Sequence, residues 1–169
     1  METIGFHREM DPENDAVFRE PIRDKVRDQA PYPKAEVKRY LDSGHPIFDI
    51  MELTIDVIGG AFRVPGGSSL LSDGRFVWRV DLAAYVERYN IELPAEFVEH
   101  AGSHGFSMPA EDLPTLRAVS KTALSAYDEV GRLLSYLRPD GREARAEYDE
   151  LGNPVKIVAV DGSVVRQTY

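Results

Sequence analysis

The fold of the first part of the chain is decided by residues 69–79, SLLSDGRFVWR. Two runs of mostly apolar residues, 69–72 and 75–79, flank the dipeptide Asp73-Gly74. A tight hairpin turn needs positive φ, which glycine adopts without steric cost. The stretch therefore predicts a β-hairpin with Trp78 in the middle of its second strand. A single tryptophan at such a position is either a core residue or an anchor for a partner.

Helical patterns lie on both sides of the hairpin. Asp81 is placed to cap the N-terminus of a helix over 82–89, and Asn90 is placed to end that helix. Apolar residues at helical spacing and a preceding proline also predict short helices over 95–101 and 34–41. Together these elements predict an α+β fold in which short helices surround a small antiparallel sheet.

Residues 47–58, IFDIMELTIDVI, are the most apolar stretch and fit two structures. Their apolar residues recur at helical spacing, but they also alternate as in a strand. If the stretch is helical, three carboxylates share one face, which either receives basic residues of a partner or is solvated. Acidic residues elsewhere in the first part of the chain could join that face. The candidate partner-binding residues are therefore Asp49, Glu52, Asp56, Asp73, Trp78 and Asp81.

The charge of the chain is unevenly distributed. The 169 residues carry a net charge of -9, with 13 Lys/Arg and 21 Asp/Glu in residues 1–117 but 7 and 8 in residues 118–169. An acidic surface disfavours nucleic acid and anionic membranes and favours encounter with basic partners. The chain has no cysteine, which excludes disulfides and thiolate chemistry. No apolar run has transmembrane length and the start does not resemble a signal peptide, so a cytoplasmic protein is expected.

A repeat marks the C-terminal part, where Tyr127, Tyr148 and Tyr169 follow one another at a spacing of 21 residues. The hexapeptide YDEVGR at 127–132 is answered by YDELGN at 148–153. Between these motifs apolar residues alternate with polar ones, and turn residues separate the runs. The pattern predicts consecutive hairpins that form a β-meander.

This pattern resembles the YD repeat of Rhs-family proteins. The residues that carry the resemblance are Tyr127, Asp128, Gly131 and Arg132 in the first copy and Tyr148, Asp149 and Gly152 in the second. In that family many such repeats coil into a hollow β-shell around a C-terminal toxin, and two repeats are too few to build one. Rhs loci also carry an immunity gene behind the toxin, where recombination leaves fragments of repeat sequence. The resemblance therefore implies an immunity gene that reads into such a fragment.

A second resemblance concerns residues 72–100, which are similar to small acidic bacterial proteins of the immunity type. It implies a protein that binds and neutralises one cognate toxin by protein–protein contact, and it implies no catalytic residues. The acidic charge adds the expectation that this toxin is basic.

Two other functions are compatible with the sequence. His100 and His104 have the i, i+4 spacing of paired helical metal ligands, which would suit a small metal-dependent enzyme. Glu99 precedes this pair, however, and Gly102 argues that the helix ends between the two histidines, so loop histidines in solvent are the simpler interpretation. The repeat could also be a structural or carbohydrate-contacting module. No serine lies in a Gly-x-Ser-x-Gly turn.

The expected organisation has three parts. They are an irregular N-terminal arm over 1–33, an acidic α+β domain over 34–117, and a β-meander of YD-repeat hairpins over 118–169 whose first strand lies near 117–126. The expected function is an immunity protein against an Rhs-type polymorphic toxin, with no catalytic residue, metal or cofactor. The sequence leaves open whether the protein is a monomer or a dimer.

Overall fold

The predicted hairpin is confirmed, and it lies in the middle of a four-stranded sheet in the computed structural model of the protein. β5 (Leu70–Ser72) pairs antiparallel with β6 (Phe76–Arg79). β2 (His45–Phe48) pairs with β5, and β1 (Glu2–Thr3) runs parallel to β6, which gives the strand order β1-β6-β5-β2. Gly74 in the turn has a φ of 92°, the positive value that such a turn requires.

Two compact units make up the chain, Met1–Val119 and Ser120–Tyr169. The structure describes residues 2–12, 17–123, 125–127, 133–137, 143–149, 151, 153–159 and 163–166. Within these ranges, no helix has the length and apolar character needed to cross a membrane.

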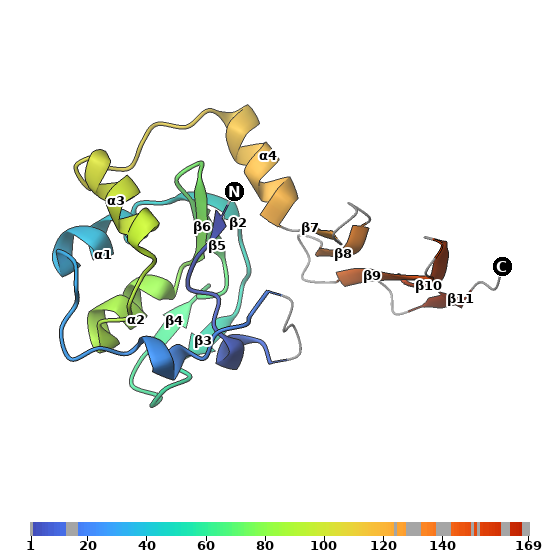
Figure 1. Cartoon of the computed structure of the whole chain (residues 1–169), viewed down its shortest axis with the longest axis horizontal. Helices are drawn as coiled ribbons and strands as arrows, with labels where there is room; N and C mark the ends of the chain where they lie inside the picture. Colours follow the sequence, from blue (N-terminus) through green and yellow to red (C-terminus); the bar gives the residue numbers. More distant parts are fainter. Residues whose placement is uncertain are drawn as a thin grey trace. The chain divides into compact units, whose positions relative to one another are not determined.

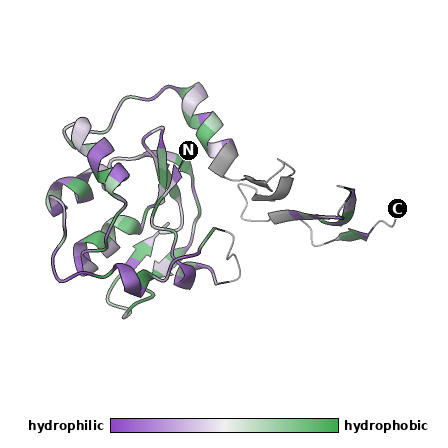
Figure 2. Ribbon diagram, in the orientation of Figure 1, coloured by the Kyte–Doolittle hydropathy of each residue, from purple (hydrophilic) through white to green (hydrophobic). Residues whose placement is uncertain are grey.

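Three helices lie together on one side of the four-stranded sheet (Figure 1). They are α1 (Lys34–Asp42), α2 (Leu82–Tyr89) and α3 (Ala95–Ser103). Each carries both hydrophilic and hydrophobic residues (Figure 2), and buried residues of all three helices share one core cluster with Phe76 and Trp78 of the sheet. Tyr85 of α2 belongs to a second cluster. This distribution confirms the α+β class, because the helices and the sheet bury their apolar faces against each other.

Trp78 is the largest side chain in this core and is fully buried. Its indole Nε1 donates a 3.1 Å hydrogen bond to the carbonyl oxygen of Leu41. The ring of Phe97 packs edge-on against it, with ring centroids 5.8 Å apart. Burial of a large apolar side chain of this kind stabilises the fold by about 2–3 kcal/mol. Of the two roles that the sequence allowed, Trp78 therefore has the core role.

The two predicted ends of α2 have different outcomes. Asn90 ends the helix in the left-handed conformation, with a φ of 50°, as predicted. Asp81 precedes the helix, but its carboxylate makes no capping hydrogen bond. It accepts two hydrogen bonds from the guanidinium of Arg79 instead, at 3.0 and 2.8 Å. The predicted cap is wrong because this buried arginine, two residues earlier, already occupies both carboxylate oxygens.

The N-terminal residues belong to the first compact unit. Where these residues are described, their regular structure outside β1 consists of two short 3-10 helices, η1 (Arg8–Met10) and η2 (Ile22–Lys25), and a parallel β-bridge between His7 and Glu20. Ile4 and Ile22 are nevertheless buried in the hydrophobic clusters of this unit. The predicted arm over 1–33 is thus irregular where the structure describes it, but it packs into the first unit because its few apolar residues complete the core.

The helical interpretation of 47–58 is wrong. After β2 the chain forms β3 (Leu53–Ile55), which pairs antiparallel with β4 (Arg63–Pro65) in a separate two-stranded sheet. Between the two strands the chain turns back in a loop that begins at Asp56. The carboxylate of Asp56 accepts hydrogen bonds from main-chain N–H groups of this loop. The shared helical face predicted for three carboxylates therefore does not exist. Those carboxylates were Asp49, Glu52 and Asp56.

A fourth helix, α4 (Leu113–Ala123), spans the boundary between the two units. The sequence predicts a strand near 117–126, and this prediction is wrong up to residue 123. Asp112 caps the helix, because its Oδ1 accepts a 2.7 Å hydrogen bond from the main-chain N–H of Thr115. Pro114 fits the first turn of the helix, where its missing N–H is not needed. The signal for this helix was therefore present in the sequence.

The described residues of the second unit form five strands, each paired antiparallel with its neighbour along the chain. These strands are β7 (Ser125–Tyr127), β8 (Leu133–Leu137), β9 (Glu143–Tyr148), β10 (Pro154–Val158) and β11 (Val164–Arg166). Between β9 and β10, Oδ1 of Asp149 accepts hydrogen bonds from the N–H groups of Leu151 and Asn153, at 3.0 and 2.8 Å. The repeat residues Asp128, Gly131, Arg132, Gly152 and Tyr169 lie outside the described residues.

Candidate functional site

Most of the candidate partner-binding residues are buried. Asp56, Asp73, Trp78 and Asp81 each expose 5% of their surface or less. Their polar groups bind other parts of the same chain, so these four side chains are not available to a partner on this surface. Asp49 and Glu52 are exposed. The prediction failed for the buried carboxylates because a sequence shows a charge but not the distant residue that neutralises it.

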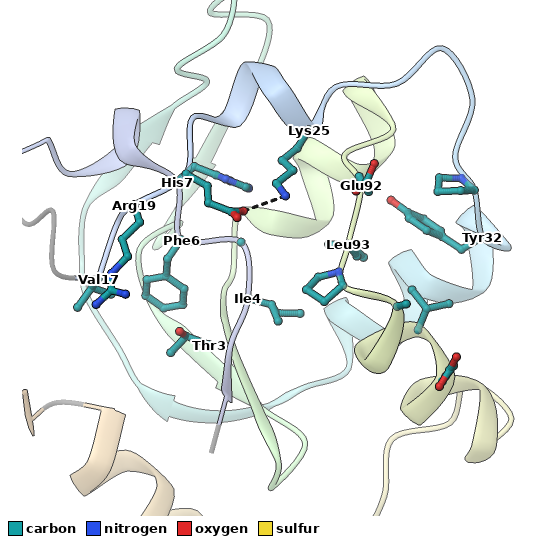
Figure 3. Close-up of a pocket in the computed structure, with 17 residues that line it drawn as sticks. Thr3, Ile4, Phe6, His7, Val17, Arg19, Lys25, Tyr32, Glu92 and Leu93 are labelled. Carbon is teal, nitrogen blue, oxygen red and sulfur yellow. Dashed lines mark ion pairs between the residues drawn. The ribbon is translucent and has the colours of Figure 1, made fainter. Parts of the chain in front are cut away.

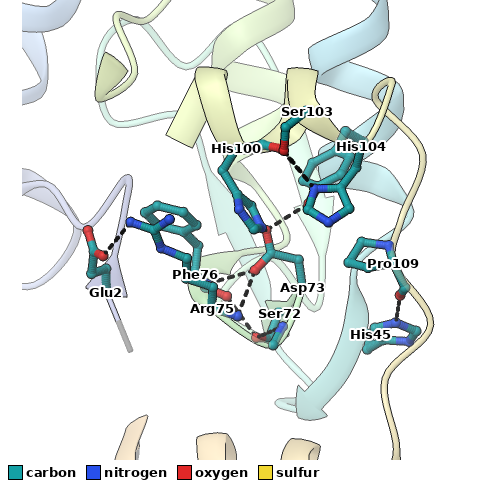
Figure 4. Close-up of polar contacts among 12 residues, drawn as sticks. Glu2, His45, Ser72, Asp73, Arg75, Phe76, His100, Ser103, His104 and Pro109 are labelled. Atoms are coloured by element: carbon teal, nitrogen blue, oxygen red, sulfur yellow. Dashed lines mark hydrogen bonds and ion pairs between the residues drawn. The ribbon is translucent and has the colours of Figure 1, made fainter. Parts of the chain in front are cut away.

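Asp73 connects the central hairpin to two helices (Figure 4). Its Oδ1 accepts hydrogen bonds from the main-chain N–H groups of Arg75 and Phe76, at 2.9 and 2.7 Å. Its Oδ2 accepts a 2.8 Å hydrogen bond from the hydroxyl of Tyr40 on α1 and lies 3.5 Å from Nε2 of His100 on α3. These contacts fix the turn and leave Asp73 no free oxygen for a partner.

The two predicted histidines lie side by side, and one of them, His100, contacts Asp73. The helix α3 ends at Ser103, between the two histidines, as predicted. The two rings pack at a centroid distance of 4.6 Å, and Nδ1 of His104 lies 2.9 Å from the carbonyl oxygen of His100. In the described part of the chain, no three His, Cys, Asp or Glu side chains are grouped so that they could hold a metal ion. His100 differs from the predicted loop histidine because it lies within the helix and faces Asp73.

Asp56 has an analogous role in the loop between β3 and β4. Its carboxylate accepts hydrogen bonds from the N–H groups of Ile58 and Ala61, at 2.8 and 2.9 Å, and from the hydroxyl of Tyr89. Burial alone would raise the pKa of Asp56, but these hydrogen bonds outweigh burial and lower that pKa. The carboxylate therefore stays ionised while it holds the loop.

An exposed surface with apolar and acidic side chains lies at 49–55. Met51 is fully exposed, and Leu53 and Ile55 expose 53% and 52% of their surface. Asp49 and Glu52 are exposed beside them in the chain. We call these five residues the 49–55 surface.

The backbone places two apolar side chains of this surface on one side. In β3, Leu53 and Ile55 are exposed, whereas Thr54 between them is partly buried and bonds to the opposite strand. Successive side chains of a strand point to opposite faces, so Leu53 and Ile55 share the outer face. Met51 precedes the strand, in a turn where the N–H of Glu52 donates a 3.1 Å hydrogen bond to the carbonyl oxygen of Ile50. The cross-strand neighbours of Leu53 and Ile55 on that face are Pro65 and Arg63.

Hydrogen bonds hold the acidic end of the 49–55 surface in place. The hydroxyl of Ser69 donates a 2.9 Å hydrogen bond to Oδ1 of Asp49 and accepts one of 2.9 Å from the N–H of Ile50. The N–H of Gly66 donates a 2.6 Å hydrogen bond to the carbonyl oxygen of Glu52. Residues 49–53, together with Pro65 and Gly66, line a hollow of about 550 Å³. The surface is thus preformed, which lowers the entropic cost of binding a partner.

The sequence identified only the acidic half of this surface. Met51, Leu53 and Ile55 were read as part of an apolar face of a helix or strand, because apolar residues are usually buried. The short length of the strand is the signal that would have indicated exposure of these apolar residues instead of burial. A two-stranded sheet of three residues per strand has little area with which to bury both of its faces.

Comparison with known proteins gives one match. Residues 127–164 match the family described as RHS Repeat, which confirms a segment of Rhs repeat in the second unit. No curated protein and no solved structure matches the chain. The match covers less than half of the chain, so it characterises the repeat segment and not the unit Met1–Val119 that carries the 49–55 surface.

Proposed function

We propose that this protein is an immunity protein that binds and neutralises an Rhs-type toxin through the 49–55 surface. The observation that carries the proposal is the group of exposed apolar side chains, Met51, Leu53 and Ile55, beside two exposed carboxylates. The Rhs repeat over 127–164 supports the class of partner, because it relates the chain to toxins of this family.

The apolar part of the surface would supply affinity. Exposed apolar side chains that stand together, with polar residues at the rim, are typical of protein–protein contact sites. A few well-packed side chains near the centre of such a contact contribute most of the binding free energy. The fully exposed Met51 and the half-exposed Leu53 and Ile55 fit this arrangement.

The acidic part would supply orientation and speed. Asp49 and Glu52 flank the apolar residues, and residues 1–117 carry an excess of eight acidic side chains over basic ones. Complementary charge accelerates encounter and selects the partner more than it strengthens the final complex. The toxin that fits this surface is therefore basic around an apolar centre.

The test measures binding of the toxin domain that is encoded beside the gene of this protein. An inactive variant of that toxin is titrated with the wild-type chain and with the double variant Met51→Ala/Leu53→Ala. We expect the double variant to weaken the dissociation constant by about tenfold to a hundredfold, which corresponds to about 1.4–2.8 kcal/mol.

A matched control is available in the second unit. Val164 and Val165 expose 50% and 51% of their surface, so Val164→Ala/Val165→Ala truncates two exposed apolar side chains that belong to the other unit. This control should bind as the wild type does. The proposal fails if the wild-type chain does not bind the toxin at all, or if the two double variants lose the same affinity.

A further inference from the structure

Among the described residues of the first unit, one buried histidine has no hydrogen-bond partner. His7 exposes 5% of its surface, and neither Nδ1 nor Nε2 makes a hydrogen bond within the described part of the chain. The carbonyl oxygen of Glu20 lies near the ring and raises the pKa of His7, but it is not placed to accept a hydrogen bond from either ring nitrogen. This oxygen instead accepts a 3.0 Å hydrogen bond from the N–H of Arg8. Nearly all buried polar groups in folded proteins are satisfied, so the ring requires another explanation.

His7 forms part of the wall of a large hollow in this unit. The hollow has a volume of about 790 Å³ and runs along residues 3–7, between the segment 17–20 and the residues that precede α3 (Figure 3). This volume lies within the usual range for a bound ligand, about 300–1,000 Å³. A buried imidazole with two unbonded nitrogens in the wall of such a hollow indicates that the hollow binds a ligand whose polar group forms a hydrogen bond with this ring.

In the described part of the chain, the strand beside the hollow has an open edge. β1 is the outermost strand of its sheet, and it uses the N–H groups of Glu2 and Ile4 to pair with β6. In a parallel ladder the intervening residue then directs its own N–H and C=O to the other side. That residue is Thr3, which lines the hollow. The hollow therefore presents a main-chain donor and acceptor together with the imidazole of His7.

Two of the basic side chains beside the hollow are paired with carboxylates. Lys25 forms a 2.9 Å ion pair with Glu20, and Arg27 binds Glu92 through a 2.8 Å hydrogen bond from its Nε. Burial lowers the pKa of His7, although the carbonyl of Glu20 and the carboxylates of Glu9 and Glu20 oppose this effect. A neutral imidazole offers one donor and one acceptor. A phosphate or another free anion is thus a poor match, whereas an uncharged amide or hydroxyl is a good one.

We propose that this hollow binds a short extended segment of another polypeptide, which pairs its main chain with Thr3 and places an uncharged polar group on His7. Addition of a strand to an open sheet edge is a common mode of peptide recognition, in which the main chain provides affinity and neighbouring pockets provide specificity. This site is separate from the 49–55 surface and does not depend on the proposed function, because any partner with an accessible extended segment could use it.

Random nine-residue peptides displayed on phage are selected on the full-length protein, and the enriched peptides are synthesised for affinity measurements. Thr3→Pro removes the N–H at the open edge without touching the hydrogen bonds to β6, and Thr3→Val is its matched control. We expect Thr3→Pro and His7→Leu to weaken binding of the enriched peptides at least tenfold, and Thr3→Val to change it less than twofold. The bound peptide should also slow hydrogen exchange at the N–H of Thr3.

The melting temperature distinguishes a binding role of His7 from a structural one. Because the ring has no hydrogen-bond partner among the described residues of the free protein, His7→Leu should leave the melting temperature unchanged or raise it, while it weakens peptide binding at least tenfold. The proposal is overturned if no peptide is enriched, if enriched peptides bind both variants as they bind the wild type, or if His7→Leu lowers the melting temperature by several degrees. The last result would show that the imidazole is hydrogen-bonded within the fold.

Discussion

The hydroxyl of Tyr40 donates a 2.8 Å hydrogen bond to Oδ2 of Asp73, and both residues are buried where α1 meets the turn of the central hairpin. Burial raises the pKa of Tyr40 above its usual range, and the bond to Asp73 raises it further. The phenol therefore remains a hydrogen-bond donor at neutral pH and well above it. The pair joins two elements that lie more than thirty residues apart in the chain.

Removal of the Tyr40 hydroxyl should destabilise the fold. In Tyr40→Phe the Oδ2 of Asp73 keeps only the contact with His100 at 3.5 Å, so a buried carboxylate oxygen loses its best donor. We expect the free energy of unfolding to fall by about 1–3 kcal/mol, measured by urea denaturation. A double-mutant cycle with Asp73→Asn isolates the pair. If the losses in free energy of unfolding for Tyr40→Phe and Asp73→Asn simply add in the double variant, the two side chains do not interact directly.

The lowered pKa of Asp56 predicts a dependence of stability on pH. A carboxyl group with a lower pKa in the folded state adds stability that is present above the pKa of the unfolded chain and is lost as pH falls through the folded value. Asp56→Asn should therefore destabilise the protein at pH 7, and the difference from the wild type should shrink as the pH falls below the ordinary value of 3.8. Urea denaturation between pH 7 and pH 3 measures this difference.

Asp28→Asn is the control for that experiment, because Asp28 is exposed. This variant should follow the wild type across the pH range. A difference between Asp56→Asn and the wild type that stays constant down to pH 3 would show that the ionised carboxylate is not what stabilises the loop.

The shape of the 49–55 surface depends on the absence of a side chain at Gly67. A Cβ atom at this position would lie 1.8 Å from Oγ1 of Thr54, so Gly67→Ala forces β3 to move. We expect Gly67→Ala to weaken toxin binding about tenfold, although Gly67 is buried and cannot contact the toxin. Thr54→Ala in the same chain should restore part of the affinity, because it removes the clashing Oγ1. Binding unchanged by Gly67→Ala would argue against a preformed surface.

Local turn chemistry made several elements predictable from the sequence. The hairpin over 69–79 follows from Asp73-Gly74, and the end of α2 follows from Asn90, because each feature depends on the φ of one residue. The sequence-based prediction missed helix α4, although Asp112 is a typical capping residue and Pro114 is typical of the first turn of a helix. Alternating apolar residues after Leu116 fit a strand equally well, and the cap should have decided between the two.

The candidate site was less predictable because it depends on contacts between distant residues. Asp56 and Asp73 look like surface charges in the sequence, and only the hydroxyls of Tyr89 and Tyr40 explain their burial. Conversely, Met51 looks like a core residue, and its full exposure follows from the small two-stranded sheet next to it. No local pattern encodes these long-range relationships.

The Rhs repeat should not be required for binding if the 49–55 surface is the contact site. The helices and the sheet that hold this surface, and the core residues Trp78 and Phe97, all lie in the unit Met1–Val119. A chain that ends at Val119 should therefore unfold cooperatively. Its dissociation constant for the toxin should lie within about twofold of the full-length value when both chains are measured in the same binding assay. If the shortened chain keeps its circular dichroism and melting transition but loses the toxin, the contact residues belong to the repeat unit, and the 49–55 surface must be assigned another partner.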